Sequence, residues 1–118
     1  MLCDLYTTAG ENFRGTPWTV YPRPQMKRDN WLNLNGNWDF TAQKESWLPK
    51  EYDLTIRVPF CPESERSGIG YRDFIPACWY RKTINVPHEK NERVLLHFEA
   101  ACHKTEVFVN GVSVGKHS

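Results

Sequence analysis

Three acidic residues lie close together in a segment rich in proline, glycine and charge. Glu63, Glu65 and Asp73 all fall within residues 59–77. A pair of carboxylates performs glycoside hydrolysis, one acting as acid or base and the other as nucleophile or base. However, 14 acidic residues among 118 make such proximity expected by chance. None of the three ends a strand in an apolar pocket that would raise its pKa, so we predict no catalytic residue in this chain.

A serine-hydrolase motif, G-x-S-x-G, occurs around Ser113, between Gly111 and Gly115. A nucleophile elbow needs a strand before the serine and a helix after it. Here the motif opens with a turn-forming Asn-Gly pair, and Ser113 alternates within a run of valines. We therefore interpret Ser113 as a polar strand residue.

Metal and cofactor signals are weak. His97 and His103 lie near Cys102, but their spacing matches no standard ligand pattern. Gly68-Ile-Gly70 is half of a dinucleotide fingerprint, with no strand before it and no helix after it. The four cysteines include no Cys-x-x-Cys pair, and we expect free, mostly buried thiols. We predict neither a metal nor a cofactor.

Composition sets limits on the class of protein. A length of 118 residues with 40% hydrophobic residues fits one globular domain. The 15 basic and 14 acidic residues are mixed, which argues against a nucleic-acid partner. No apolar run approaches the roughly 20 residues of a membrane span, and the first residues lack the pattern of a secretory signal. We therefore expect a cytoplasmic protein without a membrane partner.

The first half of the chain must supply both an arm and the start of a sheet. Residues 1–29 contain several prolines and predict an extended arm, with one short strand over 18–21. Asn35-Gly36 lies between residues 31–34 and 37–41, and Asn-Gly is the strongest short hairpin signal. Residues 43–50 favour a short helical turn.

Short alternating runs dominate the rest. Strands are predicted over residues 54–58, 79–86, 93–99, 105–109 and 112–114. A second Asn-Gly pair, Asn110-Gly111, predicts the hairpin between the last two. Residues 59–77 form a loop longer than about 12–15 residues, which is often functional. The pattern is typical of an all-β sandwich, and we expect the fold to be incomplete at the C-terminus.

Six motifs in order carry a family resemblance. They are Leu34-Asn-Gly-Asn-Trp-Asp-Phe, Val58-Pro-Phe-Cys-Pro-Glu-Ser, Trp79-Tyr-Arg-Lys-Thr-Ile-Asn-Val-Pro, Arg93-Val-Leu-Leu-His-Phe-Glu-Ala, Glu106-Val-Phe-Val-Asn-Gly and Val114-Gly-Lys-His. Over residues 30–118 the chain resembles the N-terminal sugar-binding domain of glycoside hydrolase family 2. That family includes β-galactosidases, β-glucuronidases and β-mannosidases.

The resemblance implies a jelly-roll β-sandwich of the galactose-binding type, partial here, over residues 30–118. It also implies a parent enzyme in which an immunoglobulin-like domain and a TIM barrel follow. That barrel would carry both catalytic glutamates of a retaining β-glycosidase, so this chain alone is predicted to be inactive. The family often has Asp where this chain has Cys102, which weakens any polar role at that position.

The loop over residues 59–77 would then shape the entrance for a carbohydrate, a β-glycoside. We expect its substrate-rim residues to be Glu63, Arg66, Tyr71 and Asp73. The tryptophans of the predicted strands are expected in the core, whereas the loop aromatics Phe60, Tyr71 and Phe74 are freer to meet a ligand. Two alternatives remain open: a free-standing carbohydrate-binding module without an attached enzyme, and a purely structural interaction domain.

Overall fold

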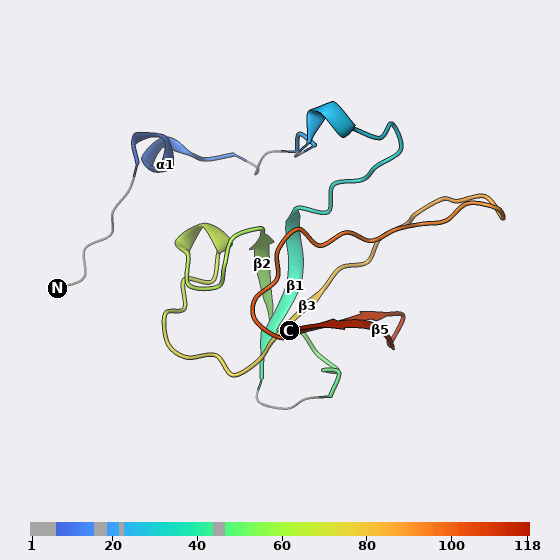
Figure 1. Cartoon of the computed structure of the whole chain (residues 1–118). Coiled ribbons are helices and arrows are strands. Elements are labelled where there is room, and N and C mark those ends of the chain that lie inside the picture. Colours follow the sequence, from blue (N-terminus) through green and yellow to red (C-terminus); the bar gives the residue numbers. More distant parts are fainter. Residues whose placement is uncertain (1–6, 16–18, 22, 44–46) are drawn as a thin grey trace. The chain divides into compact units, whose positions relative to one another are not determined.

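The structure is a computed structural model that describes residues 7–15, 19–21, 23–43 and 47–118 (Figure 1). It is mostly β, with antiparallel strands and a few short helical turns. The chain forms two compact units, one made of residues 1–45 and 49–82 and the other of residues 46–48 and 83–118. The all-β prediction is confirmed at this level, while the jelly-roll type stays a prediction.

The first unit is built on a three-stranded antiparallel sheet. Its central strand is β1 (Gly36–Ala42), flanked by β2 (Leu54–Val58) and β3 (Cys78–Arg81). Successive side chains of a strand point to opposite faces, and Phe40 lies opposite Leu54 on one side and Tyr80 on the other. Phe40 and Ile56 are almost fully buried and form the core of this unit.

The N-terminal arm carries more local structure than the sequence predicts. It contains α1 (Thr8–Asn12) and the 3-10 turn η1 (Pro24–Met26). The side chain of Thr7 caps α1 by accepting a hydrogen bond from the Gly10 N–H at 3.0 Å. Residues 19–21 form no strand, and Trp18 lies outside the described residues.

The second unit contains the hairpin of β4 (Thr105–Val109) and β5 (Val112–His117). Asn110 and Gly111 connect the strands with positive φ angles of 50° and 82°, as the favoured two-residue hairpin turns require. This prediction is confirmed. Ser113 lies in β5, so the strand reading of the G-x-S-x-G motif is confirmed as well.

The hairpin predicted at Asn35-Gly36 is wrong, because residues 31–34 form no strand. Both edges of β1 pair instead with β2 and β3, so no edge is left for a preceding strand. The Asn35 N–H donates to Asn33 Oδ1, and Trp38 Nε1 donates to the Leu34 carbonyl, both at 2.7 Å. Local hydrogen bonds of this kind give the backbone an alternative to sheet pairing.

Two further strand predictions fail where none of the described strands provides a neighbour. β3 ends at Arg81 instead of continuing to Val86, and residues 93–99 are irregular and exposed. An alternating pattern needs a neighbouring strand, since a strand's backbone groups bond to another strand. Residues 43 and 47–50 form no helical turn, and residues 44–46 lie outside the described part.

The cysteine prediction is half right. Cys61, Cys78 and Cys102 are free thiols, as expected, but all three are exposed rather than buried. Each lies at an end of a strand or in a loop, where little covers it. Cys3 is not among the residues that the structure describes.

Candidate functional site

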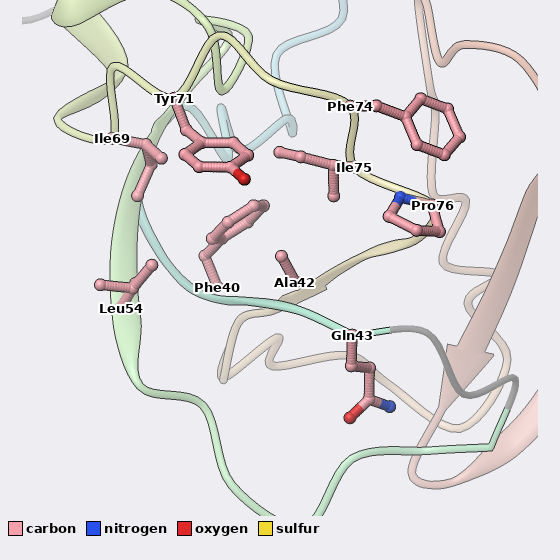
Figure 2. Close-up of a pocket in the computed structure, with 9 residues that line it drawn as sticks. All are labelled: Phe40, Ala42, Gln43, Leu54, Ile69, Tyr71, Phe74, Ile75 and Pro76. Carbon is pink, nitrogen blue, oxygen red and sulfur yellow. The ribbon is translucent and has the colours of Figure 1, made fainter.

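An open pocket of about 430 Å³ lies between the sheet of the first unit and the 59–77 loop. Phe40 and Leu54 line it from β1 and β2. Ile69, Tyr71 and Ile75 line it from the loop. Figure 2 shows Tyr71 and Ile75 directed toward Phe40, whereas the ring of Phe74 and the amide of Gln43 point away. The pocket is therefore mostly apolar.

Hydrogen bonds inside the loop hold Tyr71 in place. The buried Ser67 hydroxyl donates to the Ser64 carbonyl at 2.7 Å and accepts from the Ile69 N–H at 3.0 Å. The Tyr71 N–H donates to the Pro62 carbonyl at 3.0 Å. The loop is thus cross-linked by its own polar groups, which explains how an irregular segment can hold the backbone of Tyr71 in place.

A short 3-10 turn, η2 (Glu65–Ser67), lies within this loop. The Ser64 hydroxyl caps it by accepting from the Arg66 N–H at 3.1 Å. Gly68 follows with a φ of 84°, a left-handed conformation that suits glycine at the end of a turn. Gly68 is therefore a turn residue at the end of η2.

Arg66 contacts the N-terminal arm, and it does not line the pocket. Its guanidinium donates to the Phe13 carbonyl at 2.8 Å and lies 5.1 Å from the centre of the Phe13 ring. Phe13 also meets Phe60 edge-on, with ring centres 6.3 Å apart. These three residues form the Phe13 latch, which ties the arm to the loop.

The other three expected rim residues lie at different places on the loop. Tyr71 lines the pocket, whereas Glu63 and Asp73 are exposed on the loop. Glu63 lies within electrostatic range of Cys78 and Tyr80 of β3. The described structure therefore does not gather the four expected residues into a single cluster.

Tyr80 borders the core beside the pocket. Its ring meets Phe40 edge-on, with ring centres 5.2 Å apart. Although Tyr80 is 40% exposed, partial burial raises its pKa to about 12, helped by Cys78, Glu63 and Cys61. Burial, and next the charge of Glu63, also raise the pKa of Cys78. Both groups therefore stay neutral at pH 7.

Sequence reasoning missed a charged cluster on the opposite face of the sheet. Arg81 Nε and Nη2 donate to Asp39 Oδ2 at 2.9 and 2.8 Å, and the guanidinium lies 4.2 Å from the centre of the Tyr52 ring. Burial raises the pKa of Tyr52, with Arg81 lowering it and Asp39 raising it. The register of β1 and β3 places Asp39 opposite Arg81, and this register is seen only in the structure.

Side chains that could bind a metal do not cluster in the part of the chain that the structure describes. No group of three His, Cys, Asp or Glu side chains could hold an ion among the described residues. Within the same residues, no helix combines the length and apolar character needed to cross a membrane. The pocket is thus the site that the geometry supports best.

Two curated proteins are similar to this chain over 83% of its length. One is a β-glucuronidase of Paenibacillus borealis, 30% identical over 107 residues. The other is a β-glucuronidase of Streptococcus agalactiae serotype V, 31% identical over 102 residues. The chain spans only 18% and 16% of their lengths. No protein-family model and no solved structure matches the chain. The chain is thus similar, over most of its length, to a minor part of two glycosidases.

Proposed function

We propose that this chain is the N-terminal, non-catalytic sugar-binding region of a retaining β-glycosidase of glycoside hydrolase family 2. The parent enzyme would hydrolyse O-glycosyl bonds of β-glucuronides or related β-glycosides. The observation that carries the proposal is the similarity to two β-glucuronidases over most of this chain but less than a fifth of theirs. An immunoglobulin-like domain and a TIM barrel would supply the rest of the enzyme.

The arrangement of carboxylates supports a non-catalytic role. A glycosidase needs two carboxyl groups across the scissile bond, one with a raised pKa. Glu63, Glu65 and Asp73 are all exposed. None of them lines the pocket beneath Tyr71. The catalytic pair of the proposed enzyme would therefore lie outside this chain.

The loop over residues 59–77 would form part of the entrance to the substrate site. Tyr71 would present its ring toward the ligand, while Glu63 and Asp73 would offer exposed carboxylates. Arg66 would act indirectly, because its guanidinium already binds the arm at Phe13. Its role at the rim would be to hold the loop in position.

An absorbance assay tests the absence of catalysis. The purified chain is incubated with 4-nitrophenyl β-glucuronide and, separately, with 4-nitrophenyl β-galactoside. We expect no release of 4-nitrophenol above a sample without protein, whereas the Paenibacillus borealis β-glucuronidase serves as the positive control. Turnover that co-purifies with the chain and disappears on its removal would overturn the non-catalytic role.

A free-standing carbohydrate-binding module is the second candidate, and one observation favours it. The described lining of the pocket belongs wholly to the first unit, so this site would not require residues from an attached enzyme. An antibody raised against the chain separates the two candidates on an immunoblot of source cells. A band with several times the mass of the chain supports the enzyme, whereas a band of about the chain's own mass supports the module.

A further inference from the structure

We propose that the pocket beneath Tyr71 binds the neutral, aromatic aglycone of a β-glycoside rather than its sugar. The inference rests on the proposed function, which makes a β-glycoside the ligand, and it assigns which half of that ligand this chain contacts. The proposal is carried by the size, the lining and the preorganisation of the pocket.

The size suits a small molecule. Ligand pockets usually measure about 300–1,000 Å³ and are lined mainly by apolar and aromatic side chains with few polar groups. This pocket measures about 430 Å³, and the exposed ring of Tyr71 lines it above the buried ring of Phe40. Edge-to-face and offset contacts with an aromatic ligand suit the Tyr71 ring.

The lining favours an apolar ligand over a sugar. The lining side chains include no Lys, Arg, His, Asp or Glu. The Gln43 amide points away from the pocket, which leaves the Tyr71 hydroxyl as the polar group over Phe40 (Figure 2). Sugar hydroxyls and a glucuronate carboxylate would lose their hydrogen bonds to water here, and burial of such groups without partners is unfavourable.

The pocket is also largely preformed. The Ser67 hydroxyl and the Pro62 carbonyl fix the loop from residue 62 up to the backbone of Tyr71. Ordering of this segment should therefore reduce the free energy of ligand binding only slightly. Phe74 also lines the pocket, but its ring is 86% exposed and points away from Phe40, so it should contribute less than Tyr71 (Figure 2).

The test uses the whole chain labelled with ¹⁵N and three probes: 2-naphthol, 2-naphthyl β-glucuronide and glucuronate. We expect 2-naphthol and the naphthyl glucuronide to shift the amide signals of Ile69, Tyr71 and Ile75, and glucuronate to leave them unchanged. The inference is overturned if glucuronate shifts these signals and 2-naphthol does not, or if 2-naphthol shifts none of them.

Variants confirm the location of the site. Tyr71→Ala should weaken 2-naphthol binding about tenfold or more, whereas Tyr71→Phe should retain most of it because the ring remains. Phe74→Ala changes an exposed side chain, cannot disturb the core, and should weaken binding about threefold. Leu32→Ala is the matched control, since Leu32 is 62% exposed and does not line the pocket. Equal binding by all four variants would contradict the assigned site.

The outcomes for the two proposals are separable. If 2-naphthol binds at the pocket but the immunoblot of source cells shows only a band of the chain's own mass, the glycosidase proposal fails while the apolar site stands. If the naphthyl glucuronide binds with shifts only outside the pocket, the aglycone inference fails while the proposed function stands.

Discussion

At the scale of single residues, Ser67 has the clearest structural role. It is 1% exposed, and its hydroxyl both donates to Ser64 and accepts from Ile69. Ser67→Ala would remove the side-chain partner of the half-buried Ile69 N–H and one of the two donors to the Ser64 carbonyl, which keeps the Ser67 N–H. Loss of such a partner costs about 1–3 kcal/mol, so we expect that decrease in the free energy of unfolding, measured by urea titration.

Ser113 provides the matched control for this serine substitution. Its hydroxyl donates to Glu106 Oε1 at 2.6 Å on the exposed hairpin. Exposed substitutions usually change stability by about 0.5 kcal/mol or less, so Ser113→Ala should fall within that range at pH 7. Equal losses for the two variants would show that the Ser67 network does not stabilise the loop.

Glu106 makes the hairpin sensitive to acid. The hydrogen bond from Ser113 lowers its pKa below the ordinary value of 4.5, with Lys116 helping. A lowered pKa in the folded state means that the ionised carboxylate stabilises the hairpin. This stabilisation is complete above about pH 4.5, the pKa of an unperturbed glutamate, and is lost as the pH falls through the lower folded pKa.

Ser113→Ala should therefore raise the pKa of Glu106, as followed by the ¹³C signal of its carboxyl group during an NMR pH titration. Lys116→Met should raise it by a smaller amount, because the Ser113 hydrogen bond is the larger cause. An unchanged Glu106 pKa in Ser113→Ala would contradict the assigned cause.

At the scale of elements, the Phe13 latch joins two segments that lie far apart in sequence. Arg66 contacts both the carbonyl and the ring of Phe13. Residues in direct contact show coupling energies of about 0.5–3 kcal/mol in double-mutant cycles. For Phe13→Ala and Arg66→Ala we expect the low end of that range, since cation–π pairs near the surface contribute about 0.5–1 kcal/mol.

Hydrogen exchange gives the latch a second readout. Loss of either partner should speed exchange of the Tyr71 amide, which the loop holds against Pro62. Val20→Ala is the control, because Val20 lies on the same arm, is 67% exposed and is not one of the three latch residues. Strictly additive effects of the two substitutions, with unchanged exchange at Tyr71, would contradict the latch.

The turn between β4 and β5 depends on one glycine conformation. Gly111 has a φ of 82°, whereas Gly115 has an ordinary φ and open space where a Cβ would lie. We expect Gly111→Ala to destabilise the hairpin by about 1 kcal/mol, the scale of strain for a side chain in the left-handed region. Gly115→Ala should be tolerated. Backbone NMR contacts between Thr105 and His117, which are paired in the register, report the difference.

The sequence predicts elements well where pattern and turn chemistry agree. The bounds of β2 and the β4–β5 turn match the predictions, because strict alternation and Asn-Gly each dictate a local geometry. The same dipeptide at Asn35-Gly36 misleads, since tertiary pairing occupies both edges of β1. Residues 93–99 also alternate but form no strand, because none of the described strands lies in the same sheet beside them.

The candidate site was only partly predictable. The long loop and the availability of Tyr71 follow from its turn-rich composition, and both are seen in the structure. The contact of Arg66 with Phe13 joins positions 53 residues apart, and no local pattern encodes such a contact. The apolar pocket itself arises from the register that places Phe40 beneath the loop.

At the scale of the whole molecule, few apolar side chains are buried. Only Phe40 and Ile56 form a buried apolar core among the described residues, whereas Val94, Leu96 and Phe98 are each about half exposed. Folded domains are stable by only about 5–15 kcal/mol, so we predict low stability and a tendency of this chain to associate through its exposed apolar segments.

The central claim is that this chain binds a β-glycoside by its aglycone and does not hydrolyse it. One NMR sample tests both parts: the intact chain with 2-naphthyl β-glucuronide, followed by saturation-transfer difference spectra over a day. We predict saturation transfer to the naphthyl protons and an unchanged amount of intact glycoside. Accumulation of free 2-naphthol and glucuronate, or transfer confined to the sugar protons, would contradict the account.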